Sequence, residues 1–247
     1  ALGVNTTGTA NTAIGTNSLQ DNTTGDHNTG LGLQTLRETT TGSHNIAIGS
    51  NAMLLNATGG SNIAIGYEAL YNNTASNNVG IGYQSLKNNT SGTDNTGLGR
   101  GSLSSNNTGQ QNTAVGRQAL AANTTGAQNT AVGSYALDAN TTTSNNTAVG
   151  YFALSANTTG RNTAFGSQAL KDVQTTDHNT AIGDHCLWKT TSGSRNTGLG
   201  FQALVFNTTG SNNTGIGYNT MYTNTTGHSN VAVGDQALES NTEGTQS

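Results

Sequence analysis

Apolar and polar residues recur along this chain with a fixed long period. A five-residue block of Asn, a β-branched residue, Ala or Gly, a large apolar residue and Gly appears throughout. Successive blocks start 17 residues apart, except for two steps of 16 residues. The chain is therefore one repeat read fourteen times. The blocks begin at Asn11, Asn28, Asn45, Asn62, Asn78, Asn95, Asn112, Asn129, Asn146, Asn162, Asn179, Asn196, Asn213 and Asn230.

We number the positions of each repeat from 0, the asparagine, to 16. Position 1 is β-branched, position 2 is Ala or Gly, position 3 is large and apolar, position 4 is Gly, and position 8 is Leu or Met. Position 7 is small in nearly every copy, and positions 11 to 14 read mostly Asn-Thr-Thr-Gly. This pattern predicts short strands at positions 1–3 and 7–9. Bends are expected at the position-4 Gly and at the Asn-Thr-Thr-Gly loop, because Gly and Asn adopt positive φ at little cost.

A unit of 17 residues without a helical period is too short for a helix-turn-helix repeat and suits one coil of a β-solenoid. We expect an all-β fold, a parallel β-solenoid of about 14.5 coils, with residues 1–247 forming a single repeat domain. Stacked coils would place the asparagines in a ladder of bonded side-chain amides and the position-8 residues in an aliphatic ladder. The predicted structural ladder includes Asn112, Gly116, Leu120, Asn129, Gly133 and Leu137.

Side chains on a strand alternate between faces, so positions 2 and 7 are predicted to point away from positions 3 and 8. The large apolar face is expected to fill the coil. The small face carries no Lys or Glu in any copy, as a close-approaching backbone requires. We therefore expect this small face to pack against another copy of the chain. The candidate interface residues are Ala114, Ala119, Ala131, Ala136, Ala148 and Ala153.

The composition argues against several classes of protein. Hydrophobic residues make up 31% and charged residues 8% of the chain, both well below globular averages, and there is no Pro. Disordered chains are typically rich in charge and Pro, so disorder is not favoured. The net charge of -4 has the wrong sign for a nucleic-acid partner. No apolar run is long enough for membrane insertion, and residues 1–20 lack a signal-peptide pattern.

Several blocks carry a resemblance to known repeats. Asn-Thr-Ala-Ile-Gly at 11–15, Asn-Thr-Ala-Val-Gly at 112–116 and Asn-Val-Ala-Val-Gly at 230–234 resemble the head repeats of trimeric autotransporter adhesins. Residues 78–86 and 112–120 are similar to arrays in bacteriophage tail-fibre proteins. The resemblance covers essentially the whole chain. It implies a left-handed parallel β-roll, three copies per fibre, an extracellular location on a virion appendage or bacterial cell surface, and a role in attachment.

The repeat pattern does not indicate a catalytic site. A regular solenoid offers equivalent convex surfaces in place of a pocket with convergent acid, base and nucleophile. We expect neither catalytic residues nor a cofactor. His27 above His44 gives only two ligands, which makes a metal site weak. Cys186 stands in the small position-7 column and is interpreted as a buried apolar residue. The Gly-x-Gly motifs are positions 2 and 4 of the repeat and precede no helix, so they are not phosphate loops.

Binding specificity must lie in the variable columns. The candidate contact residues for a surface glycan or host receptor are Trp188, Phe201, Val205, Phe206, Tyr218 and Tyr222. Lateral packing within a fibre is the alternative interpretation of this apolar group. Position 5 also stacks Tyr67 and Tyr83 over Arg100 and Arg117. Sequons such as those at Asn22, Asn123, Asn157 and Asn207 follow from the loop consensus and are interpreted as structural turns.

The sequence thus predicts a non-enzymatic structural and adhesive fibre shaft, assembled as a homotrimer or filament. The chain begins inside a repeat and ends at a repeat boundary, which favours a segment of a longer fibre. One alternative is a soluble ice-binding or other surface-active solenoid that uses the Thr columns at positions 12 and 13. A self-stacking extracellular filament subunit is a second alternative.

Overall fold

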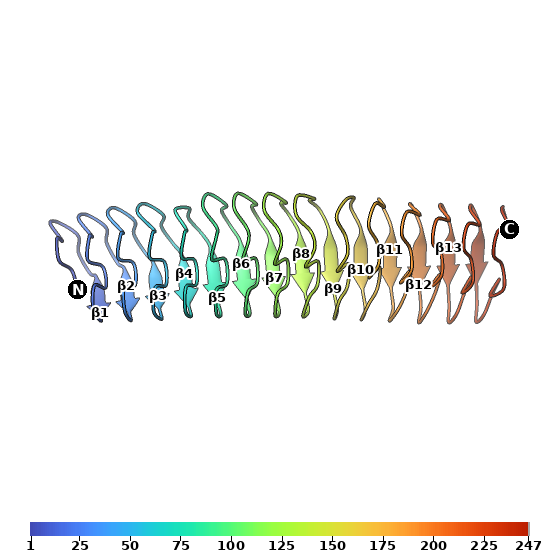
Figure 1. The fold of residues 1–247 in the computed structure, drawn as a ribbon, viewed down its shortest axis with the longest axis horizontal. Helices are drawn as coiled ribbons and strands as arrows, with labels where there is room; N and C mark the ends of the chain where they lie inside the picture. Colours follow the sequence, from blue (N-terminus) through green and yellow to red (C-terminus); the bar gives the residue numbers. More distant parts are fainter. Residues whose placement is uncertain (247) are drawn as a thin grey trace. The chain divides into compact units, whose positions relative to one another are not determined.

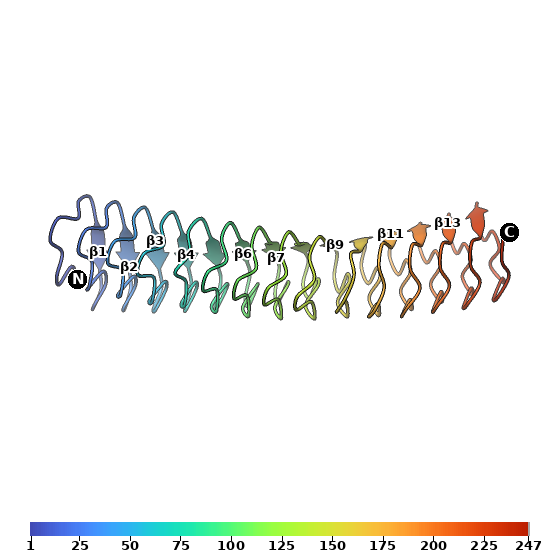
Figure 2. The same cartoon turned by 90° about the horizontal axis from the view of Figure 1, so that it is seen from above.

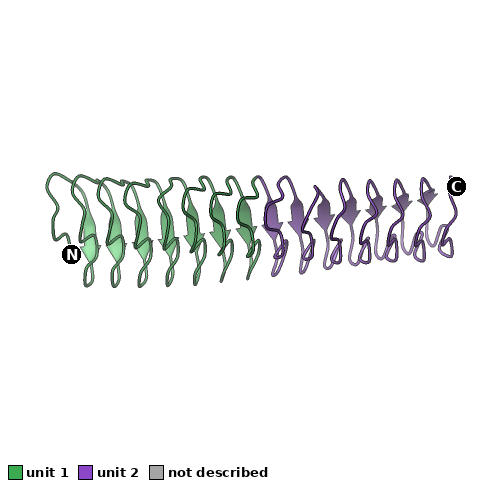
Figure 3. Cartoon of the chain, turned by 45° about the horizontal axis from the view of Figure 1, so that its top comes forward, with its two compact units in different colours: residues 1–127 green, residues 128–247 purple. Residues whose placement is uncertain are grey.

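The computed structural model describes residues 1–246 and divides the chain into two compact units, residues 1–127 and residues 128–247 (Figure 3). No described residue is helical, and each repeat contributes one three-residue strand at positions 1 to 3 (Figure 1). The first unit contains β1 (Thr12–Ile14), β2 (Thr29–Leu31), β3 (Ile46–Ile48), β4 (Ile63–Ile65), β5 (Val79–Ile81), β6 (Thr96–Leu98) and β7 (Thr113–Val115). The second contains β8 (Thr130–Val132), β9 (Thr147–Val149), β10 (Thr163–Phe165), β11 (Thr180–Ile182), β12 (Thr197–Leu199), β13 (Thr214–Ile216) and β14 (Val231–Val233).

Within each unit the strands lie side by side in chain order and are parallel (Figure 2). The register always pairs like positions, as in Thr12 with Thr29 and Thr163 with Thr180. Across the first 16-residue step, Ile63 still pairs with Val79, so the missing residue is absorbed outside the strand. The fold is therefore the predicted parallel β-solenoid with a repeat of roughly 17 residues. The single-domain expectation stays a prediction.

The second predicted strand, at positions 7–9, is wrong for the described residues. Positions 6 and 8 have positive φ, for example +54° at Gln84 and +53° at Leu86. Left-handed residues interrupt an extended strand, although the N–H of Leu86 still donates to the Ser102 carbonyl in the next coil at 2.9 Å. Side chains here therefore do not alternate between two faces. Those at positions 7 and 8 both lie inside the coil, as Ser85 and Leu86 do.

The small columns do not form an outer face, which corrects the predicted interface. Positions 2 and 7 line the interior beside the position-8 leucines, while the large residues at position 3 point outward, as Leu98 does. The strand itself alternates as expected, but the opposite face is the one buried. Since the interior of the coil is narrow, only small side chains fit beside leucine. All six candidate interface residues are fully buried within the single chain: Ala114, Ala119, Ala131, Ala136, Ala148 and Ala153.

Positions 2 and 7 are matched in volume. Each of the five glycines at position 2 has Ser, Thr or Cys at position 7 of its own or the preceding repeat, as Gly97 has Ser102 and Ser85. A Cβ added at Gly97 would lie 2.6 Å from the Ser85 hydroxyl oxygen, closer than packed atoms tolerate. The restriction that suggested a contact between chains is thus core packing within one chain.

The invariant Gly at position 4 ends the strand. Gly82 has φ of +132°, a conformation that L-residues rarely adopt. A Cβ there would also lie 2.6 Å from the Gly99 carbonyl oxygen in the next coil. Both backbone conformation and close stacking of coils therefore require Gly.

The position-0 asparagines form a buried ladder between coils. The Asn45 Nδ2 donates to the Gly59 carbonyl at 2.8 Å and to the Asn28 Oδ1 at 3.1 Å. The Asn45 Oδ1 in turn accepts from the backbone N–H and Nδ2 of Asn62 at 3.0 and 3.1 Å. One amide thus satisfies backbone groups in two coils, which an apolar side chain could not do.

A second asparagine ladder occupies position 11, where the sequence pattern suggested only a turn. Asn89 and Asn106 are fully buried, and the Asn106 Nδ2 donates to the Asn89 Oδ1 at 2.7 Å and to the Gly109 carbonyl at 2.9 Å. Thr39 and Thr190 replace Asn in this column, and each has a buried hydroxyl oxygen without a hydrogen-bond partner. The near-constant Asn of the loop is therefore an interior residue, a role that its constancy could have signalled.

Candidate functional site

The outward side chains at positions 1 and 3 form an exposed apolar surface, which we call the strand face of each unit. In the first unit Ile65 is 36% and Leu98 is 43% exposed. In the second unit Phe165 is 41% and Leu199 is 42% exposed. Scattered exposed leucines are ordinary, but an unbroken column of half-buried and exposed apolar side chains is a candidate interaction surface. Sequence reasoning missed this surface because it placed position 3 inside the coil.

The strand face carries no charge. Positions 1 and 3 hold only Thr, Val, Ile, Leu and Phe in all fourteen repeats. Seven strands at about 4.8 Å spacing and three residues at about 3.3 Å rise make a face of about 33 by about 10 Å in each unit. Position 3 makes this face apolar along its length, while position 1 is Thr on most strands, and apolar patches of a few hundred Å² are often functional. An uncharged surface of this length is suited to contact with another apolar surface.

Aromatic residues at position 5 lie beyond the position-4 bend, next in the chain after the strand face. Tyr67 and Tyr83 are about half exposed and stack with ring centroids 5.4 Å apart, and the Arg100 guanidinium lies 5.7 Å from the Tyr83 ring. The expected Tyr–Arg column is thus present in the first unit. The hydrogen bond with Lys87, at 2.7 Å, holds the pKa of the neighbouring Glu68 carboxyl below its usual value.

The predicted glycan or receptor residues do not form one patch. Phe201 and Tyr218 are exposed and stack at 5.6 Å, whereas Phe206 packs edge-on against Tyr222 at 5.1 Å. Val205 is 1% exposed and cannot contact a ligand, which corrects its assignment. Position 9 is half-buried in most repeats, and the short aliphatic side chain of Val205 is fully covered there.

Trp188 lies in a separate cluster of rings and lysines. The Lys189 and Lys171 ammonium groups lie 4.3 and 5.9 Å from its ring centroid, and Lys171 also lies 5.2 Å from the Phe152 ring. The His185 ring meets Trp188 edge-on at 4.7 Å. These contacts occupy the indole, so its half-buried ring has a packing role in this chain.

The loop threonines serve the stacking of coils. At position 12, the Thr23 hydroxyl donates to the Thr40 carbonyl at 2.9 Å, and the Thr40 hydroxyl donates to the Ala57 carbonyl at 3.1 Å. The same arrangement recurs in the second unit, where Thr208 donates to Thr225 at 3.0 Å. The position-12 hydroxyls are thus engaged with the next coil.

The sequon asparagines are interior residues. All four examples from the sequence, Asn22, Asn123, Asn157 and Asn207, are fully buried at position 11. Their side-chain amides therefore cannot carry a glycan in the folded chain.

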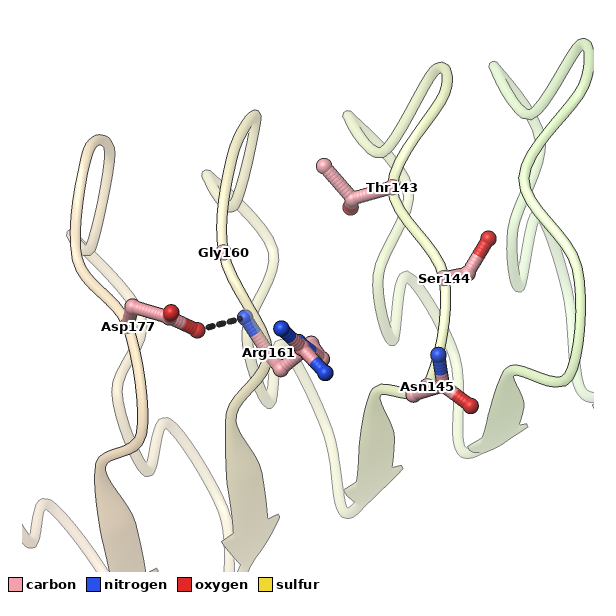
Figure 4. Close-up of a pocket in the computed structure, with 6 residues that line it drawn as sticks. All are labelled: Thr143, Ser144, Asn145, Gly160, Arg161 and Asp177. Carbon is pink, nitrogen blue, oxygen red and sulfur yellow. Dashed lines mark hydrogen bonds between the residues drawn. The ribbon is translucent and has the colours of Figure 1, made fainter.

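A shallow polar depression of about 310 Å³ lies beside the second short repeat, lined by Thr143, Ser144, Asn145, Gly160, Arg161 and Asp177 (Figure 4). Arg161 stands alone where the 17-residue repeats have two residues, and it lines this hollow. The Arg161 N–H donates to the Asp177 carboxylate at 2.7 Å. Nothing in this arrangement is typical of a catalytic centre.

Titratable side chains are dispersed. His27 and His44 stack at 5.0 Å in adjacent coils, as their spacing predicts. Among residues 1–246, no group of three His, Cys, Asp or Glu side chains could hold a metal ion. Cys186 is fully buried, and burial raises the pKa of its thiol to about 12, so it behaves as the small apolar residue expected.

No described helix is long and apolar enough to cross a membrane. Comparison of the sequence with family models, with curated proteins and with solved structures gives no match.

Proposed function

We propose that this chain is a non-enzymatic structural element of a fibre, and that its strand face packs against the strand face of other copies of the chain. The uncharged, exposed apolar column at position 3 carries this proposal. Water-exposed aliphatic side chains gain about 25 cal/mol per Å² when they are buried, and a repetitive apolar face complements itself. The interface thus lies on the face opposite to the buried alanines.

The interior of each coil supports a structural role. The asparagine ladders, the position-8 column and the position-4 bend use every constant position for stacking one coil on the next. Invariant residues that serve only the fold leave the outward columns for contacts with partners. A left-handed coil, a trimer and a place on a virion appendage or bacterial surface belong to the proposal through the resemblance of the repeats.

Attachment to a host surface would then depend on exposed residues outside the strand face. The Phe201 and Tyr218 stack is the best candidate among the predicted residues, because both rings are about half exposed. Exposed aromatic rings bind sugar faces and protein surfaces alike. The proposed partners are therefore other copies of the chain, with a surface glycan or receptor as an additional partner.

Light scattering of the purified chain, combined with charge insertion, tests self-association. We expect the parent to be an oligomer and the Ile81→Lys and Leu98→Lys variants, which place a charge on the strand face, to be monomers. Thr108→Lys and Gln110→Lys add the same charge to an exposed loop and should leave the mass unchanged. A monomeric parent, or a strand-face variant that keeps the parent's mass, would contradict the proposal.

Ice binding is a second candidate, now on a different surface. Position 1 is Thr on six successive strands, β8 to β13, where these side chains flank the outward position-3 residues of a parallel sheet. A regular array of Thr and aliphatic groups can order water. A face covered by another copy cannot contact ice, so a monomer with measurable thermal hysteresis, lost on Thr180→Lys, would favour this candidate.

A further inference from the structure

Copies that pack through strand faces meet a register problem. Position 3 is aliphatic or Phe in every strand, so a slip of one coil would replace each contact at this position with an equivalent one. The slip would cost little at this position, and a uniform face would allow many registers. A fibre with one defined structure needs a non-uniform feature on that face. This inference rests on the proposed self-association.

Position 1 supplies such a feature in the first unit. Ile46, Ile63 and Val79 occupy position 1 of β3, β4 and β5, whereas β1, β2, β6 and β7 have Thr. Only these three neighbouring strands have aliphatic residues at both outward positions, and we call their six outward side chains the aliphatic block. In the second unit, position 1 is Thr from β8 to β13 and Val only at β14.

The surroundings of the aliphatic block favour a contact with protein. The stacked Tyr67 and Tyr83 follow β4 and β5 in the chain and are about half exposed. Ile46 and Ile65 are 39% and 36% exposed within the block. Clustered tyrosines beside aliphatic groups, with Arg100 against a tyrosine ring, have the composition of the energetic centre of an interface.

The preferred register depends on which side chains of the facing copy lie opposite the aliphatic block. When block meets block, aliphatic side chains cover aliphatic side chains on three strands. A slip by one coil sets a block residue against Thr at each end, and a slip by three coils leaves the whole block against Thr. Each covered Thr hydroxyl then loses water without gaining a partner. We propose that the aliphatic block of β3–β5 fixes the register of self-association, with the block of one copy seated on the block of the next.

Cysteine cross-linking of the full chain tests this arrangement. Ile65→Cys places a thiol at the centre of the block, and Leu31→Cys places one two strands away. After oxidation of a mixture of both variants, we expect disulfides only between like variants, Ile65→Cys with Ile65→Cys and Leu31→Cys with Leu31→Cys, and no mixed disulfide. The masses of the linked peptides identify each species. The buried Cys186 thiol does not compete.

The register variant is Ile46→Thr/Ile63→Thr/Val79→Thr, which installs the residue that most other repeats have at position 1. In this background, the Ile65→Cys and Leu31→Cys chains should form mixed disulfides while the oligomer mass persists. The matched control, Ile48→Val/Ile81→Val, changes position 3 of the same block and should give like-variant disulfides only. Mixed disulfides in the parent background would overturn the block-on-block contact.

The outcomes separate this inference from the proposed function. An oligomeric register variant that still gives like-variant disulfides only would overturn the register role and leave self-association intact. Dissociation of that variant into monomers would also overturn the register role, because the block would then supply the affinity itself. A monomeric parent would overturn both the self-association and the register.

Discussion

Leucine in a left-handed conformation is the most unusual feature at the scale of single residues. All fourteen residues at position 8 have positive φ, as at Leu86 and Leu120. This conformation costs an L-residue about 1–2 kcal/mol, whereas removal of a buried leucine side chain costs about 2–5 kcal/mol. Burial therefore outweighs the backbone cost, which explains why a residue that avoids positive φ occupies this position throughout.

Because of this backbone cost, we expect Gly to be more stable than Ala at position 86, which reverses the usual order. Leu86→Ala and Leu86→Gly both lose the buried side chain, but Gly relieves the strain of φ at +53°. We expect Leu86→Gly to be about 1 kcal/mol more stable than Leu86→Ala, measured by urea unfolding. The control Ala69→Gly lies at position 7, where φ is not positive, and should be less stable than the parent. A Gly variant less stable than the Ala variant would contradict the assigned strain.

The volume match of positions 2 and 7 predicts a coupled pair. A Cβ at Gly198 would lie 2.4 Å from the Cys186 sulfur, so Gly198→Ala should destabilise the chain by about 1–3 kcal/mol. In the Cys186→Ala background the space is free, and the same substitution should be neutral or stabilising. A double-mutant cycle of unfolding free energies measures the coupling. Additive effects would show that the two positions do not compete for one space.

At the scale of elements, the coil is the unit of structure and the strand is only three of its residues. Most backbone hydrogen bonds between neighbouring coils are offset by one position, as from the Leu86 N–H to the Ser102 carbonyl, whereas the Asn45 ladder bonds join like positions through side chains. Sequence periodicity predicted the coil, its length and the parallel register. It did not predict the loss of the second strand, because the left-handed backbone at positions 6 and 8 has no signature in residue type: Gln and Leu are not residues that favour positive φ.

Coils that contact only their neighbours should be removable one at a time. Deletion of residues 95–111 removes one complete repeat and joins Asp94 to Asn112, so every column stays aligned. We expect a folded β-protein with a modestly lower melting temperature, followed by circular dichroism. Deletion of residues 95–103 removes about half a repeat and misaligns both asparagine ladders, so cooperative melting should be lost. Equal stability of the two deletions would contradict the coil as the unit of stability.

At the scale of the whole molecule, charge and apolar surface are segregated. The chain has 20 charged residues of the Lys, Arg, Asp and Glu types, and none lies at positions 1 or 3. The ion pairs, such as Lys87 with Glu68, belong to other columns. Association through the strand face therefore depends on apolar burial, with little contribution from Coulomb attraction.

Salt should accordingly have little effect on the assembly. Raising NaCl from about 0.05 M to about 0.5 M shortens the Debye length several-fold and weakens exposed ion pairs, while apolar burial is unaffected or slightly strengthened. We expect the mass from light scattering to be constant over this range. Dissociation at the higher salt concentration would show that charged columns, and not the strand face, hold the copies together.

The sequence by itself determined the repeat, its parallel in-register stacking, the position-4 bend and the ladder of asparagines, because each depends on identical residues meeting at a fixed period. Only the tertiary structure decided which side of the strand is buried. Alternation shows that positions 2 and 3 face opposite ways, but it does not tell which of the two faces the interior. The position-8 leucines fill the interior, so the position beside them takes Ala131, and the larger Val132 is left on the outward side.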